Sequence, residues 1–155
     1  MEKTQRLELV LETAIFCRKV RNKGMPSAVW SKTMREAIFS VWEKRGNKSK
    51  ISAAKYRSAN SQDLVFGKNE LRYDHAIPMR LVQQEIMESN PLNIKILKEI
   101  LDRKVISCLL TKSEDEKLTY LGLRSKMPDG WDGIDPLARY KKAQIEIVQN
   151  ELFVS

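Results

Sequence analysis

Apolar side chains recur at helical spacing along most of this chain of 155 residues, and that pattern limits its possible folds more than any other feature. In residues 5–21 the apolar positions fall three or four apart with charged residues between them, which predicts an amphipathic helix with one buried face. Further helices are predicted from Ser31 up to Gly46, from Met79 to Met87, around residues 94–101, from Ser113 onward, and from Pro136 through Val148.

Two short segments are typical of strands. Residues 105–111 are apolar and rich in β-branched side chains, as in a buried strand. Residues 64–73 hold an apolar run, a turn and an alternating tail, so they fit either a small hairpin or one irregular strand. Residues 46–63 are polar and predict a mostly exposed connection. The predicted fold class is α+β, mainly helical, with a small β element packed among helices.

The length suits a single domain over residues 1–155. Hydrophobic residues make up 42% of the chain, which is enough for a real core and argues against global disorder. Within the domain we expect a basic helical part over residues 1–60, a central element over 64–118, and a loop with a C-terminal helix over 119–155.

Cysteine usage and hydropathy indicate a reducing, aqueous compartment. Cys17 and Cys108 lie far apart in apolar runs, so both are expected to be small buried hydrophobes rather than a disulfide or a zinc pair. No run approaches the roughly 20 apolar residues of a membrane span. The first residues carry glutamates where a signal peptide needs an apolar core. We therefore expect a cytoplasmic protein without a membrane partner.

Positive charge is concentrated in the first part of the chain. The net charge is +8 and the isoelectric point about 9.5. Residues 1–60 carry 14 basic and 5 acidic side chains, whereas the remaining residues carry 14 and 15. Either this excess is a solubilising surface, or it forms a phosphate-binding face that releases counterions on binding. The expected partner is nucleic acid, with DNA favoured over RNA, or alternatively an acidic protein.

Residues 121–137, rich in glycine and proline, are expected to form a structured loop, since Leu123, Met127 and Trp131 can anchor it. Trp131 could instead stack on a base. The candidate nucleic-acid contacts are the basic cluster at 44–50, Arg57 beside Tyr56, and two residues of the loop that could bind phosphate, which gives Lys44, Arg45, Lys48, Lys50, Arg57, Arg124 and Lys126. The alternative for the cluster and Arg57 is an ordinary solvated face.

The single histidine, His75, lies in the motif DHAIP over residues 74–78, between a predicted strand element and a predicted helix. The later predicted strand is followed by TKSEDEKL over residues 111–118. Together these motifs resemble the HNH, or ββα-metal, endonuclease superfamily, and the resemblance covers residues 64–118. Many members have an acid-His-apolar-x-Pro motif at a strand end, and a second strand followed by a helix that carries a metal ligand.

The resemblance implies a role for three residues. His75 matches the general base that activates water, Asp74 matches the first metal ligand, and Asp115 stands where a ligand histidine is usual. Two carboxylates and a phosphate oxygen suit Mg²⁺ or Mn²⁺. Such an ion would neutralise charge on the phosphorane during phosphodiester hydrolysis. The chain departs from the family pattern in lacking the ligand histidine and a clear match for the middle asparagine.

Two functions therefore remain open from the sequence. The first is a metal-dependent HNH-like endonuclease. The second is a non-catalytic module with a degenerate nuclease element, which binds nucleic acid or inhibits a protein, for example in phage–host conflict. For each candidate residue an ordinary structural role is the alternative: Asp74 and His75 can end a strand as a hydrogen-bonded pair, and Asp115 can favour a helix N-terminus.

Overall fold

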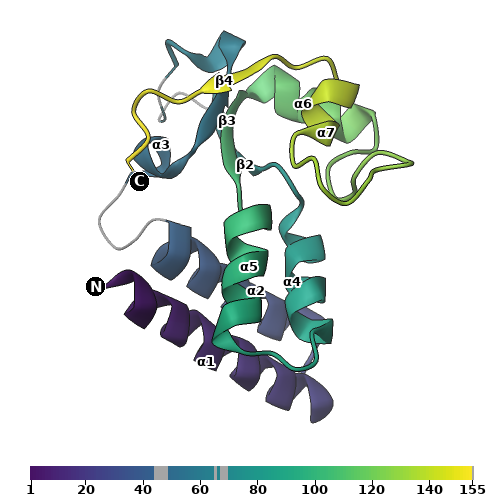
Figure 1. Ribbon diagram of the computed structural model, residues 1–155. Helices are drawn as coiled ribbons and strands as arrows, with labels where there is room; N and C mark the ends of the chain where they lie inside the picture. The colour runs from purple at the N-terminus through teal and green to yellow at the C-terminus, as the bar shows by residue number, and fades with distance from the viewer. Residues whose placement is uncertain (44–48, 65, 67–69, 155) are drawn as a thin grey trace.

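A computed structural model describes residues 1–155 except 44–48, 65, 67–69 and 155. The protein has two layers, a helical bundle and a four-stranded sheet flanked by short helices (Figure 1). The predicted α+β, mainly helical class is confirmed. The bundle contains α1 (Lys3–Asn22), α2 (Ser27–Ala37), the π-helical turn η1 (Ile38–Glu43), α4 (Met79–Glu88) and α5 (Ile94–Lys104).

The sheet layer contains β1 (Tyr56–Ser58), β2 (Leu71–His75), β3 (Ser107–Thr111) and β4 (Ile147–Gln149), with α3 (Lys50–Ala53), η2 (Ala59–Ser61), α6 (Lys112–Tyr120) and α7 (Ala138–Lys142). The strand order is β2-β3-β1-β4. β3 pairs antiparallel with β2 and parallel with β1, and β4 runs antiparallel to β1. Of the described residues from 64 to 73, those from Leu71 onward belong to β2, and the partner of this strand is β3.

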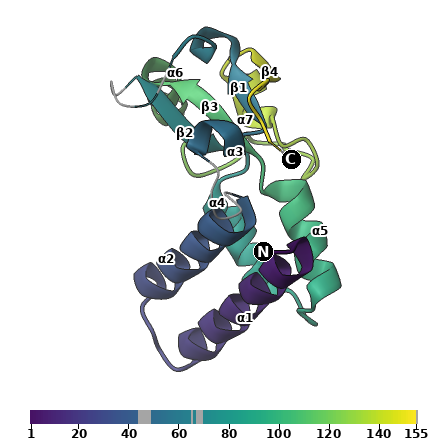
Figure 2. The same cartoon turned by 90° about the vertical axis from the view of Figure 1, so that its left-hand side faces the viewer.

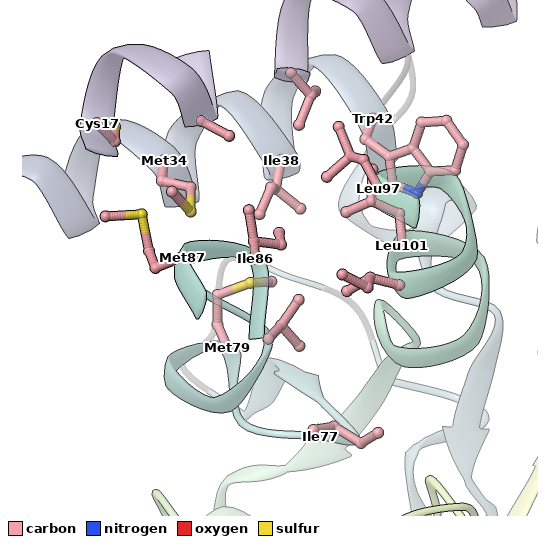
Figure 3. Packing of buried hydrophobic residues seen from close by; sticks show 14 of the residues in the cluster. Cys17, Met34, Ile38, Trp42, Ile77, Met79, Ile86, Met87, Leu97 and Leu101 are labelled. Carbon is pink, nitrogen blue, oxygen red and sulfur yellow. The ribbon is translucent and has the colours of Figure 1, made fainter. Parts of the chain in front are cut away.

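Amphipathic helices build the bundle around one apolar cluster, shown in Figure 3. From α1 the cluster takes a stripe at helical spacing, and from α2 and η1 it takes Met34, Ile38 and Trp42. α4 and α5 follow β2 and precede β3, so the chain leaves the sheet, crosses into the bundle and returns (Figure 2). Ile86, Leu97 and Leu101, from these two helices, are fully buried in the same cluster.

The central strand β3 is covered on both faces. Leu109 packs with Ala54 and Leu71 on the side of α3. On the other face Cys108 and Leu110 lie in the apolar cluster that α6 and α7 help to form. Since successive side chains of a strand point to opposite faces, this double coverage explains why residues 107–110 are all buried.

The predicted start of the helix after β3 is wrong by two residues. The capping box is formed by Thr111 and Glu114 rather than by Ser113 and Glu116. The Thr111 hydroxyl accepts the backbone N–H of Glu114 at 3.2 Å, and the Glu114 carboxylate accepts the N–H of Thr111 at 2.9 Å. The same sequence pattern occurs twice, and the copy that directly adjoins β3 is used because the strand leads straight into the helix.

The predicted C-terminal helix is too long. α7 ends at Lys142, Gln144 adopts a positive φ of 55°, and residues 147–149 form β4 beside β1. The apolar positions of this segment fit either element, and the edge of β1 decides in favour of a strand because its backbone groups need partners.

The prediction of a mostly exposed connection over residues 46–63 is also wrong for its described part. It contains β1, and Arg57, Ser58 and Ser61 are buried. The Arg57 guanidinium donates to the backbone carbonyls of Ser61 and Leu64, which allows this polar segment to lie inside the fold. In the expected basic helical part over 1–60, the described residues up to Glu43 form α1, α2 and η1, whereas those from Lys50 onward form α3, β1 and the start of η2 in the sheet layer.

Other expectations are confirmed. Leu123 and Met127 are buried and Trp131 is half-buried, with its indole N–H donating to the Asp135 carbonyl at 2.8 Å. Cys17 and Cys108 are buried free thiols. Among the helices that the structure describes, none combines the length and the apolar character that crossing a bilayer requires.

Leu101→Ala tests the bundle core. Leu101 is fully buried, so the substitution should lower the free energy of unfolding by about 2–5 kcal/mol, as measured by urea denaturation. The matched control is Leu152→Ala, at a residue that is 59% exposed, and it should change the stability by less than about 0.5 kcal/mol. Equal effects of the two substitutions would contradict the described core.

Candidate functional site

The candidate site lies at the carboxyl end of β2, where Asp74 and His75 are neighbours. Asp74 contacts Arg139 and Tyr140 of α7, whereas His75 contacts Glu43 of η1. Successive strand residues point to opposite faces, so the two side chains have entirely different surroundings. The side chain of Asp74, the predicted metal ligand, and that of His75, the predicted base, therefore point to opposite faces of the strand.

Asp74 is held by two donors on the face of the sheet near α7. Its Oδ2 accepts the Arg139 Nη2–H at 2.6 Å and the Tyr140 hydroxyl at 2.7 Å. Burial raises the pKa of the Asp74 carboxyl, while the guanidinium, the Tyr140 hydroxyl and His75 oppose that rise. The negative charge of Asp115 contributes to the rise in the pKa of Asp74.

The Arg139 side chain is the most buried charged group of the site, with 1% of it exposed. Besides Asp74, it donates to the backbone carbonyls of His75, Ala76 and Leu123. One guanidinium thus ties the end of β2 to the start of the loop at 121–137. A buried guanidinium requires such a set of acceptors because an unpaired buried charge is strongly unfavourable.

Asp74 and Asp115 could together supply oxygen ligands. Asp74 Oδ1 has no hydrogen bond from any described residue, and 20% of the Asp74 side chain is exposed. Asp115 is half-buried in the first turn of α6. A pair of carboxylates suits Mg²⁺ or Mn²⁺. Over the described ranges, no three side chains of His, Cys, Asp or Glu come together in a way that could hold a metal ion.

His75 belongs to a network on the opposite face. Its Nε2 lies 2.8 Å from Glu43 Oε2, and the Tyr73 hydroxyl donates to Glu43 Oε1 at 3.1 Å. The Glu43 side chain is 4% exposed and that of His75 is 17% exposed. The rings of Phe39, Tyr73 and His75 follow one another edge to face. Burial and the Glu43 charge together raise the pKa of Tyr73.

A carboxylate that fixes one nitrogen of an imidazole is an arrangement used for general bases. Here that arrangement stands apart from Asp74 and Asp115, since the strand separates the two networks. The same contacts also have a structural effect, because Glu43 comes from the bundle and Tyr73 and His75 come from the sheet. The network therefore links the two layers.

Sequence reasoning missed Glu43, Arg139 and Tyr140. Glu43 lies 32 residues from His75, and Arg139 lies 65 residues from Asp74. The only local signal for Glu43 was an acid at the end of an apolar run, IFSVWE. Arg139 and Tyr140 lie in a segment that was predicted to be an ordinary amphipathic helix.

The predicted nucleic-acid contacts have different outcomes. The prediction for Arg57 is wrong. This residue is 6% exposed, and its guanidinium donates to the backbone carbonyls of Ser61 and Leu64, so it does not present a free charge at the surface. Lys50 is exposed, and its Nζ lies 5.9 Å from the ring centres of Phe39 and of Phe66. Arg124 and Lys126 are exposed in the loop at 121–137. Lys44, Arg45 and Lys48 lie outside the described residues.

Comparison with protein-family models, with curated proteins and with solved structures gives no match to this chain. The contacts and charges described above therefore carry the functional assignment.

Arg139→Ala tests the network around Asp74. Removing one partner of a buried ion pair should lower the free energy of unfolding by about 3–5 kcal/mol in urea denaturation at neutral pH. Lys142→Ala, an exposed change in the same helix, is the control and should have an effect below about 0.5 kcal/mol. A tolerated Arg139→Ala would mean that Asp74 does not depend on this guanidinium.

Proposed function

We propose that this protein binds nucleic acid through the basic surface of its helical bundle, and that the strand end at Asp74 and His75 has a structural role. The observation that carries the proposal is that most of the described exposed basic residues in the first part of the chain, residues 1–60, have no acidic partner among the described residues. Of the exposed basic residues in the first part, Lys3 pairs with Asp102. The others in the described ranges form no ion pair with a described residue: Lys19, Arg21, Lys23, Lys32, Arg35, Lys50 and Lys55.

Ion pairing is more frequent in the second part of the chain, residues 61–155. Its basic residues include several with acidic partners, as in Lys98 with Asp102, Lys104 with Glu85 and Lys141 with Asp135. The basic excess of residues 1–60 is therefore not neutralised inside the described structure. A surface of unpaired lysine and arginine side chains favours a polyanion, because each neutralised phosphate releases condensed counterions.

The surroundings of Asp74 and His75 support a non-catalytic element. Asp74 is committed to Arg139 and Tyr140, and His75 is committed to Glu43 on the other face. The hydrogen bond to Glu43 ties the His75 side chain to the bundle, whereas Arg139 and Tyr140 tie Asp74 to α7.

Salt-dependent binding tests the proposal. Fluorescence anisotropy of labelled DNA and RNA oligonucleotides should show affinity that falls linearly with salt on a log–log plot. Lys19→Glu with Lys23→Glu should reduce the magnitude of that slope by about 2. The control is Lys98→Glu, because Lys98 already pairs with Asp102. Absence of binding at low salt, or binding that does not respond to salt, would reject nucleic acid and favour a protein partner.

A second candidate, metal-dependent phosphodiester hydrolysis, is favoured by one specific observation. β2 pairs antiparallel with β3 and α6 follows β3, as the resemblance to HNH endonucleases implies, while α4 and α5 lie between the two strands in the chain. Asp74 Oδ1 and Asp115 would hold the ion, and the ion would supply charge stabilisation at phosphorus.

A degradation assay distinguishes the two functions. Wild-type protein with plasmid or RNA and Mg²⁺ or Mn²⁺ should show no cleavage above background if binding is the function. Cleavage that is lost in both His75→Ala and Asp115→Asn would establish hydrolysis instead. Asp115→Asn is the sharper variant, because Asp115 is only half-buried and makes no side-chain hydrogen bond to another described residue.

A further inference from the structure

We infer that a groove between α2 and α4 holds an unpaired nucleotide of single-stranded nucleic acid, with its base against Trp30 and its phosphates on three arginines. This inference rests on the proposed function and gives it a location. The groove has a volume of about 350 Å³, within the range of about 300–1,000 Å³ typical of small-molecule sites. The side chains that define it are Arg21, Trp30, Arg35, Arg80, Gln84 and Glu88.

Helical spacing brings the lining residues to one side of each helix. Three lining residues of α2 lie four positions apart, namely Ser27, Ser31 and Arg35, and Trp30 lies three positions after Ser27. On α4 the same spacing joins Arg80, Gln84 and Glu88, and Arg21 comes from the last turn of α1. The groove is thus built on helices rather than on loops.

Hydrogen bonds from two side chains, Gln83 and Arg18, join the helices around the groove. The buried Gln83 Nε2 donates to the Ser31 carbonyl at 2.7 Å, which joins α4 to α2. Arg18 donates to the Met87 carbonyl through Nε at 3.1 Å and through Nη2 at 3.0 Å, which joins α1 to the end of α4. The three helices are therefore held in register around the groove, which favours binding without a large rearrangement.

Trp30 provides an aromatic surface. It is half-buried and packs against the bundle core, and it also lines the groove. Its backbone carbonyl accepts the Cys17 thiol at 3.4 Å. A tryptophan supported on one side by a packed core and open on the other can stack on a base of any sequence.

The charges of the groove favour phosphate. Neither Arg21 nor Arg35 has a hydrogen bond or an ion pair with any described side chain. The guanidinium fork of arginine matches two phosphate oxygens. Glu88 is the one acidic residue among the described lining, and its Oε1 accepts the Gln84 Nε2–H at 3.1 Å. The three arginines therefore outweigh it.

Arg80 extends the basic track beyond the groove. Its Nη2 donates to the Ser125 carbonyl at 3.1 Å. Ser125 lies in the chain between Arg124 and Lys126, which are both exposed. These two residues, predicted to contact nucleic acid, therefore lie near Arg80 at the end of the groove. A strand that places one nucleotide on Trp30 can thus continue toward the loop at 121–137.

The stacking surface decides between single-stranded and duplex nucleic acid. Bases of a duplex are already stacked on their neighbours and cannot enter a groove without leaving the helix, which costs free energy. An unpaired base has both faces available. Single-stranded nucleic acid is therefore the favoured ligand.

The test compares a labelled single strand of about ten nucleotides with a duplex of the same length by fluorescence anisotropy. We expect tighter binding of the single strand. Trp30→Leu keeps an apolar side chain on the core but removes stacking, and should weaken single-strand binding about 5- to 100-fold. Arg35→Glu, at an exposed residue, should weaken binding without unfolding the protein. Lys98→Glu is the control and should retain wild-type affinity.

Tryptophan fluorescence supplies a second measurement. The single strand should quench wild-type emission, and much of that quenching should disappear in Trp30→Phe. If Trp30→Leu and Arg35→Glu bind as tightly as the wild type while binding stays salt-dependent, the groove assignment is wrong and the proposed function stands. Equal affinity for duplex and single strand also overturns the assignment. If the wild type binds neither, the proposed function fails first.

Discussion

The buried guanidinium of Arg139 is the interaction on which the sheet layer depends. It is almost fully enclosed, and its donors reach Asp74 and the carbonyls of His75, Ala76 and Leu123. Such a charge is tolerated inside a protein only when its donors are satisfied, so all of these acceptors must stay in place together. The end of β2, α7 and the beginning of the loop at 121–137 are fixed as a unit, which in turn sets the position of Ser125, whose carbonyl accepts a hydrogen bond from Arg80.

Glu43 has the corresponding role on the opposite face. It accepts the Tyr73 hydroxyl and pairs with His75, and it comes from the last residue of η1 in the bundle. Two neighbouring residues of one strand, Asp74 and His75, are therefore used to join that strand to different parts of the molecule. This use explains their unusual sequence setting without requiring that they share an ion. It also leaves the charge of the bundle surface as the feature that most favours a ligand.

The charge distribution has a structural basis. The second part of the chain carries near-equal numbers of acids and bases, and its basic side chains include several in ion pairs. The first part has 14 basic and 5 acidic residues, of which α1 and α2 carry 7 and 3. Arg21 from α1 and Arg35 from α2 line the groove together with Arg80 from α4. The bundle thus presents cations on a rigid support, and the sheet layer is joined to the pair of α4 and α5, since β2 leads into α4 and β3 follows α5 (Figure 1).

The sequence by itself determined the helices, the strand β3 and the uneven charge, because apolar periodicity and composition are local properties. The sequence could not decide between two structures where the local pattern fits both equally well. The capping box was predicted two residues too late, because two copies of one pattern overlap near Thr111. Residues 147–149 form a strand rather than the predicted helix, because the edge of β1 offers hydrogen-bond partners. Only the tertiary structure decided that Arg57 is buried, that Glu43 meets His75, and that Arg139 meets Asp74. These contacts join residues far apart in the chain, and no spacing rule reaches that far, since they depend on which faces the packed elements turn toward each other.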